Sequence, residues 1–92
     1  KDQRYILAVF RSRQHTLQYE AVLKRMGIQS EVISTPKETS VGCGLSLKID
    51  IRDLRRITEL WQYNRPDPLV GVYIVEHGMG KKILRNVRVF SL

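Results

Sequence analysis

The stretch Leu45–Ile51, LSLKIDI, alternates strictly between aliphatic and polar residues. Its leucines and isoleucines would share one side of an extended chain, while Ser46, Lys48 and Asp50 would share the other. This period of two predicts a strand that buries one face. The elements before and after the strand then have to cover that face.

Toward the N-terminus, Tyr5–Phe10 (YILAVF) is a continuous apolar run of strand length, typical of a central strand. Ser12 is suited to cap a following helix, and Gly27 is suited to end it. A short strand over about 29–35, ended by Pro36, completes this half. Helical spacing gives the helix an apolar stripe of Tyr19, Val22, Leu23 and Met26, with Leu17 and Ala21 beside it.

Toward the C-terminus, Asp53 is suited to cap a second helix, and the segment NRPDP at 64–68 ends it. A fourth apolar strand follows at Leu69–Val75, and then a turn at His77–Gly80. Val87–Leu92 is a candidate last strand. The core-facing residues of the second helix are expected to be Leu54, Ile57, Leu60 and Trp61.

This order of elements predicts a single domain over residues 1–92 with an α+β fold. Right-handed crossovers favour a ferredoxin-like split β-α-β sandwich (βαββαβ), in which an antiparallel sheet carries two helices on one face. Residues 81–92 would form a short C-terminal extension that could add a fifth strand.

The chain of 92 residues carries a net charge of +7, which favours anionic partners such as nucleic acid or an acidic protein surface. The cations recur along the whole chain, so a generally basic surface is favoured over a dedicated nucleic-acid groove. No apolar run approaches the ~20 residues that span a bilayer. One cysteine cannot form an internal disulfide, so we expect a cytoplasmic protein without a membrane segment.

That cysteine, Cys43, lies between Gly42 and Gly44 at the end of a polar loop, PKETSVGCG. The strands at 5–10 and 29–35 would end at the same rim of the sheet, which brings this loop to the start of the first helix. Helix N-termini and nearby cations favour the thiolate form of a cysteine, and glycines leave room for a second sulfur. The groups expected to stabilise or bind the thiolate are Arg11, Ser12, Arg13, Lys37, Gly42 and Gly44.

A packed core cysteine is the competing interpretation. Cys43 has the parity of Leu45 and Leu47, so a strand extended backwards would direct its side chain into the core, where cysteine is often found. On the residues alone this interpretation is slightly stronger. The two glycines weaken it, because they can break the strand register before the cysteine.

Two segments resemble the small bacterial family of selenium/sulfur carrier-like proteins: FRSRQHTLQYEAVLKRMGI at 10–28 and VISTPKETSVGCGLSLKI at 32–49. The resemblance covers about the first half of the chain. Lys37 stands where arginine is common in the family, and residues 81–92 have no counterpart. The matching positions are Phe10, Ser12, Glu20, Gly27, Ile28, Thr35, Pro36, Lys37, Ser40, Gly42, Cys43, Gly44, Leu45 and Leu47.

The resemblance implies that Cys43 accepts sulfur or selenium as a persulfide-type adduct and relays it to another protein. Such a protein would be a carrier rather than an independent enzyme, and it would need no cofactor. The implied partners are a pyridoxal-phosphate cysteine desulfurase or selenium donor, and an acceptor enzyme. A homodimer through pairing of exposed edge strands, with Val87–Leu92 as a candidate segment, is a further expectation.

The histidines and the glycine-rich turn are weaker candidates. His15, about one turn into the first helix, could assist proton transfer at Cys43, although a structural role at the helix start is commoner. His77 is expected at the far rim, and two distant histidines with one cysteine make no metal site. GMGKK at 78–82 lacks the spacing of a phosphate-binding loop and is expected to be a solvated turn.

The alternative function is a ferredoxin-like RNA-binding or protein-interaction module in which Cys43 is only structural. Its support is a cluster of arginines near the second helix, which an ordinary solvated face containing Glu59 would also explain. RNA-binding sheets stack bases on aromatic side chains, but no KGFGFV-like segment is present. The arginines are Arg52, Arg55 and Arg56, and the aromatic residues on expected strands are Tyr5, Phe10 and Tyr73.

Overall fold

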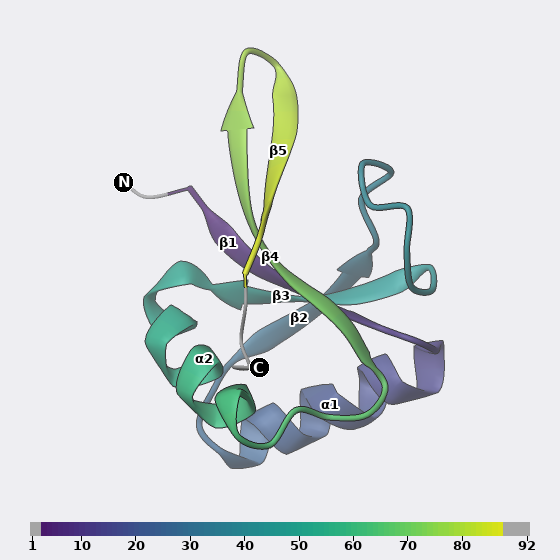
Figure 1. The fold of residues 1–92 in the computed structure, drawn as a ribbon, viewed down its shortest axis with the longest axis vertical. Helices are drawn as coiled ribbons and strands as arrows, with labels where there is room; N and C mark the ends of the chain where they lie inside the picture. The colour runs from purple at the N-terminus through teal and green to yellow at the C-terminus, as the bar shows by residue number, and fades with distance from the viewer. Residues whose placement is uncertain (1–2, 88–92) are drawn as a thin grey trace.

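The computed structural model describes residues 3–87 and contains five strands, two α-helices and one 3₁₀ turn (Figure 1). In chain order the elements are β1 (Tyr5–Phe10), α1 (Arg13–Arg25), β2 (Ser30–Ser34), β3 (Leu45–Asp50), η1 (Ile51–Asp53), α2 (Leu54–Gln62), β4 (Leu69–Gly78) and β5 (Lys81–Asn86). The α+β class expected from the sequence is confirmed.

The strands form one antiparallel sheet in the order β2-β3-β1-β4-β5. The central strand β1 pairs with β3 on one side and with β4 on the other, so that Ala8 lies between Leu47 and Val72. The ferredoxin-like prediction counts four strands and a short extension. The extension at 81–92, which was expected to be able to add a fifth strand, contains a full fifth strand at the edge beside β4, and β2 forms the opposite edge.

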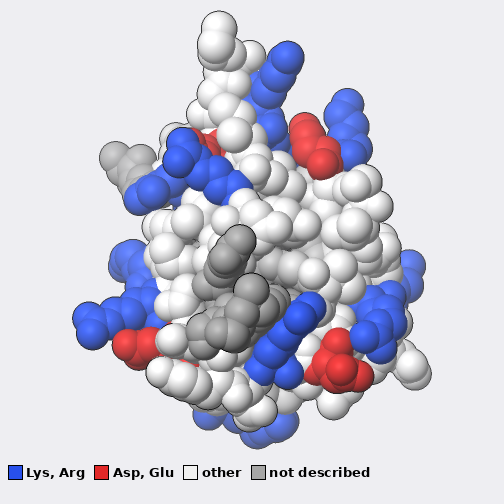
Figure 2. Space-filling view, in the orientation of Figure 1, with Lys and Arg blue, Asp and Glu red and all other residues white. Residues whose placement is uncertain are grey.

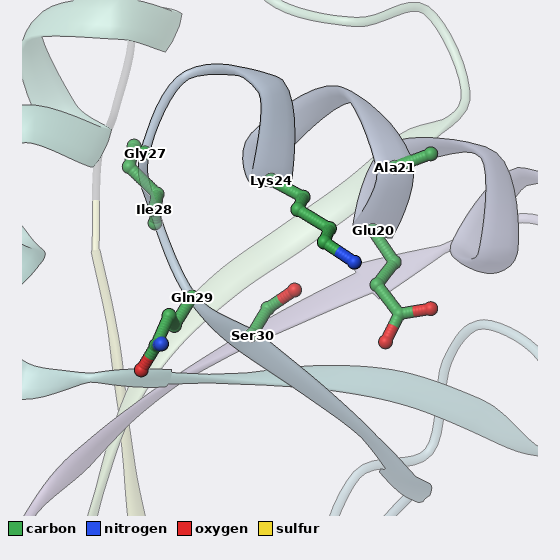
Figure 3. Close-up of a pocket in the computed structure, with 7 residues that line it drawn as sticks. All are labelled: Glu20, Ala21, Lys24, Gly27, Ile28, Gln29 and Ser30. Carbon is green, nitrogen blue, oxygen red and sulfur yellow. The ribbon is translucent and has the colours of Figure 1, made fainter.

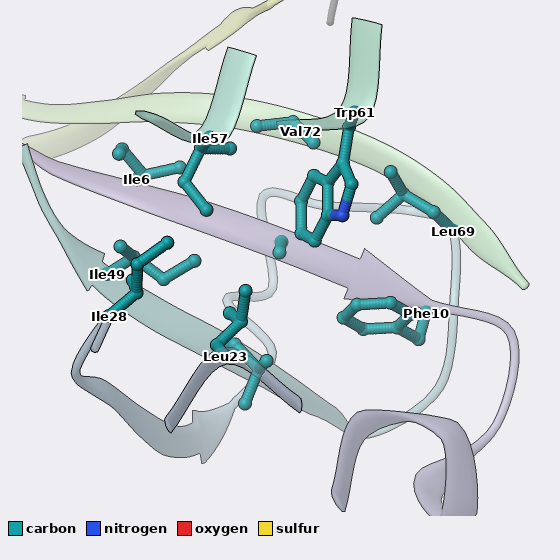
Figure 4. Close-up of a cluster of buried hydrophobic side chains, with 11 residues drawn as sticks. Ile6, Phe10, Leu23, Ile28, Ile49, Ile57, Trp61, Leu69 and Val72 are labelled. Atoms are coloured by element: carbon teal, nitrogen blue, oxygen red, sulfur yellow. The ribbon is translucent and has the colours of Figure 1, made fainter. Parts of the chain in front are cut away.

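Both helices contribute to the core on one face of this sheet (Figure 4). Leu23 of α1 and Ile57 and Trp61 of α2 pack against the alternate residues of β1 that point the same way. Phe10, at the end of β1, is fully buried and makes an edge contact with Trp61 at a ring-centroid distance of 6.2 Å. Burying aromatic and aliphatic side chains of this size supplies most of the driving force for folding in a domain this small.

The other face of the sheet carries a smaller apolar cluster built from Tyr5, Leu7, Val9 and Val75. Lys48 on β3 places its Nζ 4.8 Å from the centre of the Tyr5 ring. The glycine before the cysteine lies against Val9, since a Cβ atom on Gly42 would meet the Val9 side chain. The loop between β2 and β3 is therefore packed onto this second face.

Helix α1 begins and ends where the sequence predicts. Ser12 is its N-cap, with Oγ accepting a hydrogen bond from the backbone N–H of His15, and Gly27 adopts a left-handed φ of 77° after the last turn. The predicted apolar stripe is partly wrong. Thr16 and Leu23 are the buried positions, whereas Leu17 and Met26 are exposed, because the helix is rotated so that Thr16 faces the sheet.

The start of α2 differs from the prediction. Asp53 precedes the helix but makes no capping hydrogen bond with its side chain. Asp50 takes that role one turn earlier, where its carboxylate accepts from the backbone N–H of Arg52 at the start of η1. The predicted inward residues Leu54, Ile57, Leu60 and Trp61 do pack into or against the core.

The last hairpin also differs from the prediction. Strand β4 continues through His77 to Gly78, so the turn is Met79–Gly80 rather than the whole HGMG segment. Both turn residues have positive φ, as two-residue hairpins of this twist require. The fifth strand is Lys81–Asn86, and the expected strand at Val87–Leu92 lies outside the described residues except for Val87, which is not in a strand. Neither α1 nor α2 is long and apolar enough to cross a bilayer.

Candidate functional site

Cys43 lies in the loop between β2 and β3, and hydrogen bonds on both sides hold its backbone. The Cys43 N–H donates to the carbonyl of Phe10 at the end of β1 over 3.2 Å. The Cys43 carbonyl accepts a hydrogen bond of 2.7 Å from the hydroxyl of Thr35. The N–H of Thr35 in turn donates to the carbonyl of Gly44. Cys43 is thus fixed to the central strand and to the end of β2.

The sulfur of Cys43 lies beside the first turn of α1. Its thiol donates to the carbonyl of Leu45 over 3.3 Å, and Sγ is 3.7 Å from the hydroxyl oxygen of Thr16. Thr16 is fully buried, and its hydroxyl can donate to the Leu45 carbonyl (3.1 Å) or to the Ser12 carbonyl (3.2 Å). The cysteine itself is half-buried.

This geometry suits both the neutral and the charged form of the Cys43 sulfur, because the Thr16 hydroxyl can bond either to a carbonyl or to the sulfur. The neutral thiol donates its proton to Leu45, whereas a negatively charged sulfur can only accept. The Thr16 hydroxyl can rotate from a carbonyl toward Sγ, because hydroxyl protons turn freely about the C–O bond. A charge on the sulfur would then have a donor at the buried side of the site.

The two glycines beside Cys43 have different environments. Gly42 has a φ of +84°, and a Cβ atom there would also meet the Phe10 carbonyl oxygen. At Gly44, no heavy atom of the described chain lies within 4 Å of the position that a Cβ atom would take. Gly42 is therefore required by the backbone and its packing, while Gly44 leaves open space next to the cysteine.

Within residues 3–87, the hydrogen bonds of the Cys43 sulfur are to Thr16 and Leu45 and not to any of the predicted cations. Arg11 donates from its backbone to Pro68 and from Nη2 to the carbonyl of Asp67, so its guanidinium is held by the loop before β4. Arg13, the first residue of α1, and Lys37, in the loop after β2, are both exposed to solvent. Stabilisation of a thiolate by these three cations stays a prediction.

Ser12 and His15 form a local pair at the start of α1. Ser12 Oγ accepts from the His15 backbone and lies 2.7 Å from Nδ1 of the same histidine. This arrangement joins the imidazole to the helix cap. Ser12 also contributes the carbonyl that accepts from Thr16, so it contacts the cysteine site through Thr16.

Sequence reasoning missed Thr16 and Thr35, the two threonines that hold Cys43. The inward face of α1 was predicted from its apolar residues, and this criterion does not identify a buried threonine such as Thr16. A usable signal was present: Thr16 lies four residues after the cap Ser12, where a hydroxyl commonly bonds to the carbonyl one turn back. Thr35 is one of the positions that match the family, but the sequence did not show its role, which depends on pairing across to Gly44.

The arginine cluster near α2 is occupied by intramolecular contacts. Arg52 makes two side-chain bonds to Asp50, and Arg55 pairs with Glu59 on the next turn. Arg56 donates to the carbonyl of Met26 over 2.7 Å, which satisfies a free carbonyl at the end of α1. These contacts favour a structural role for the cluster.

Of the three aromatic residues expected on strands, two are buried, and Tyr73 is partly buried against the second cluster. Phe10 is in the core and stacks on Tyr19 with ring centroids 5.0 Å apart. Tyr5 is only 7 % exposed and its ring is covered by Lys48. Lys and Arg lie around the outline of the face shown in Figure 2 rather than in one band. Within residues 3–87, no three His, Cys, Asp or Glu side chains are grouped as a metal site would need.

Residues 5–69 match the model of the family described as "Putative Se/S carrier protein-like". The chain belongs to this family. No curated protein and no solved structure matches the chain. In this Se/S carrier-like protein, the matched segment runs from β1 to the first residue of β4. It therefore contains Cys43 and both segments that hold its sulfur, the first turn of α1 and the start of β3.

Proposed function

We propose that this Se/S carrier-like protein holds a sulfur or selenium atom on Cys43 and relays it between protein partners. The observation that carries the proposal is the position of the Cys43 sulfur. Cys43 is half-buried, its sulfur lies between the Thr16 hydroxyl and the Leu45 carbonyl, and the residue is inside the segment that defines the family. A Cβ atom on the next residue, Gly44, would meet open space. A partner sulfur can approach from the open side while the buried side supplies a hydrogen-bond donor.

Loading proceeds by attack of one sulfur on another. The Cys43 thiol loses its proton, and the thiolate attacks the outer sulfur of a protein persulfide on the donor. A new S–S bond forms on Cys43, the donor's S–S bond breaks, and the donor leaves as a thiolate that takes up a proton. The sulfur moves with no net oxidation, and delivery repeats the same exchange with a nucleophile of the acceptor.

The chain's own groups have distinct parts in this exchange. The Thr16 hydroxyl donates to the sulfur when it is negatively charged, and Gly44 leaves room for the incoming sulfur. Arg13 and Lys37 add positive charge at the rim, and Ser12 fixes the first turn of α1, with Arg11 held beside it. Gly42 supports the loop conformation. A cysteine desulfurase or a selenium donor would supply the atom, and a biosynthetic enzyme would accept it.

The first test is direct loading. Incubation with glutathione persulfide, followed by mass spectrometry of the intact protein, should show the added mass of one sulfur atom on the wild type. Cys43→Ser should show none. A wild-type chain that gains no sulfur, or a Cys43→Ser variant that gains as much, would refute the proposal.

The second test separates the function of Thr16 from a packing effect. Thr16→Val keeps the shape but removes the hydroxyl, so loading at pH 7 should slow by about ten- to a hundredfold, since a hydrogen bond to a charged group contributes roughly 1.5–3 kcal/mol. Thr16→Ser retains the hydroxyl and should stay near the wild-type rate. Equal rates for the valine and serine variants would exclude a role for the hydroxyl.

A further inference from the structure

The edge strand β2 presents a row of backbone groups that have no partner within residues 3–87. Thr35 donates to Gly44 in the register that pairs β2 with β3, so this pair is a hydrogen-bonded one. Hydrogen-bonded and non-bonded pairs alternate in antiparallel ladders, so Glu31 and Ile33 bond to β3. The N–H and C=O groups of the other three residues therefore point away from the sheet: Ser30, Val32 and Ser34. The strand contains neither proline nor lysine, the residues that commonly protect an edge.

Helix α1 turns one side toward this same edge. A pocket of about 720 Å³ lies there, between the second half of α1 and the start of β2 (Figure 3). Glu20, Ala21 and Lys24 line it from the helix, and Ser30 lines it from the strand. The Ser30 hydroxyl is buried and has no hydrogen-bond partner within residues 3–87. One helical turn before Ala21, Leu17 is 50 % exposed on the same side.

Charges of both signs lie along the strip of α1 that faces this edge, although the whole chain carries +7. Glu20 lies between Arg13 and Lys24 on the helix, whereas Glu31 of β2 lies on the other face of the sheet, opposite Lys48. Two copies of so basic a protein repel each other over most of their surface. On the strip, each copy offers both signs of charge, and Arg13 near the start of α1 is complementary to Glu20 in its second half.

We propose that a second copy of this chain binds here, with β2 pairing antiparallel to β2 around Val32. Ser30 of each copy then faces Ser34 of the other, and Val32 faces Val32, so the outward groups match one another. The pairing adds about six hydrogen bonds between the copies. It continues the five-stranded sheet across both molecules.

The spacing of the helices fits this arrangement. Helix α1 packs against both β2 and β3, so it lies over the boundary between them. With strands about 4.8 Å apart, the two α1 helices would lie about 10 Å from each other. Packed helices are separated by roughly 8–10 Å, so the helices meet through Leu17 and the small Ala21 as the strands pair. Antiparallel packing also brings Arg13 of each copy toward Glu20 of the other.

The proposed dimer does not use the reactive thiol. Pairing ends at Ser34, and each Cys43 lies beyond that end, on the loop between β2 and β3. Both cysteines therefore remain open, and the dimer should form equally in reducing buffer and in the Cys43→Ser variant. These properties make it independent of the carrier proposal.

Sedimentation equilibrium of the full chain in reducing buffer tests the proposal. The wild type should sediment with about twice the 10.7 kDa of one chain. Ser34→Pro removes an outward N–H that the fold itself does not use, so it should sediment as a single chain, with Ser34→Ala as the matched control that stays dimeric. Leu17→Glu changes an exposed side chain and should also give a single chain.

Hydrogen exchange adds a residue-level measurement. The amides of Ser30, Val32 and Ser34 should exchange more slowly as the protein concentration rises. A glutamate at Ile83, which is 45 % exposed on the opposite edge strand β5, should leave the dimer intact. A single-chain mass for the wild type at 100 µM (about 1 mg/mL) would overturn the proposal. A dimer that survives both Ser34→Pro and Leu17→Glu, or that Ile83→Glu dissociates, would also overturn it.

Discussion

Gly42 and Gly44 flank the same cysteine, yet substituting alanine at each should give opposite results. In Gly42→Ala, the new methyl group would sit in left-handed backbone, which costs about 1–2 kcal/mol. It would also push into the fully buried Val9 and the Phe10 carbonyl. Overpacking of this kind costs roughly 1–3 kcal/mol. Together these terms lower the free energy of unfolding by about 2–5 kcal/mol.

Gly44→Ala is the matched control for this change. The new methyl group would meet open space, and Gly44 has no left-handed backbone. Substitutions at such sites usually change stability by less than about 0.5 kcal/mol. The variant should therefore fold as well as the wild type.

Urea unfolding followed by the fluorescence of Trp61, which is 2 % exposed, measures both variants. With a slope of about 1 kcal/mol per molar urea for a chain this small, Gly42→Ala should move the midpoint down by about 2–5 M. Gly44→Ala should leave it within about 0.5 M. If Gly42→Ala unfolds at the wild-type midpoint, or if both variants fall equally, the loop is not seated on β1 as described.

Three further predictions concern stability. Burial raises the pKa of Tyr5, and the Glu38 carboxylate raises it further, so the fold holds this phenol neutral. The unfolded chain ionises first, so stability should be full below about pH 10 and fall above it. Tyr5→Phe should lessen this alkaline loss in urea titrations at several pH values, whereas Tyr63→Phe, at an 85 % exposed position, should not. Arg56→Gln removes the bond to the end of α1 and should cost about 1 kcal/mol, against about 0–0.5 for the surface-paired Arg55→Gln. Leu23→Ala should cost about 2–5 kcal/mol in calorimetry, because its side chain is fully buried; a loss under 1 would contradict the described core.

Local chemistry determined which elements the sequence could predict. Ser12 and Gly27 mark the ends of α1 because capping depends on residues within one turn. The alternation in 45–51 predicted β3 because a half-buried strand imposes a period of two. Asp53 misled the prediction for α2, since Asp50 is an equally good cap three residues earlier and the chain uses it for η1.

Tertiary contacts determined what the sequence could not show. The inward position of Thr16 depends on how α1 is rotated against the sheet, and its contact with Cys43 joins residues far apart in the chain. The extension of β4 through His77 depends on pairing with Lys82 across the hairpin. The sequence placed a glycine on each side of Cys43, but their different environments follow from Val9, which no local pattern connects to the loop.

The hydrogen bonds that hold the backbone of Cys43 to Phe10 and Thr35 have a consequence for the proposed sulfur transfer. Because these bonds hold the backbone of Cys43, its sulfur moves only by rotation of its own side chain and is not carried outward by the loop. In the proposed transfer, the donor and the acceptor must therefore bring their own reactive groups to Cys43. Mobile segments of the donor and the acceptor, rather than of this chain, would then limit the rate of sulfur transfer.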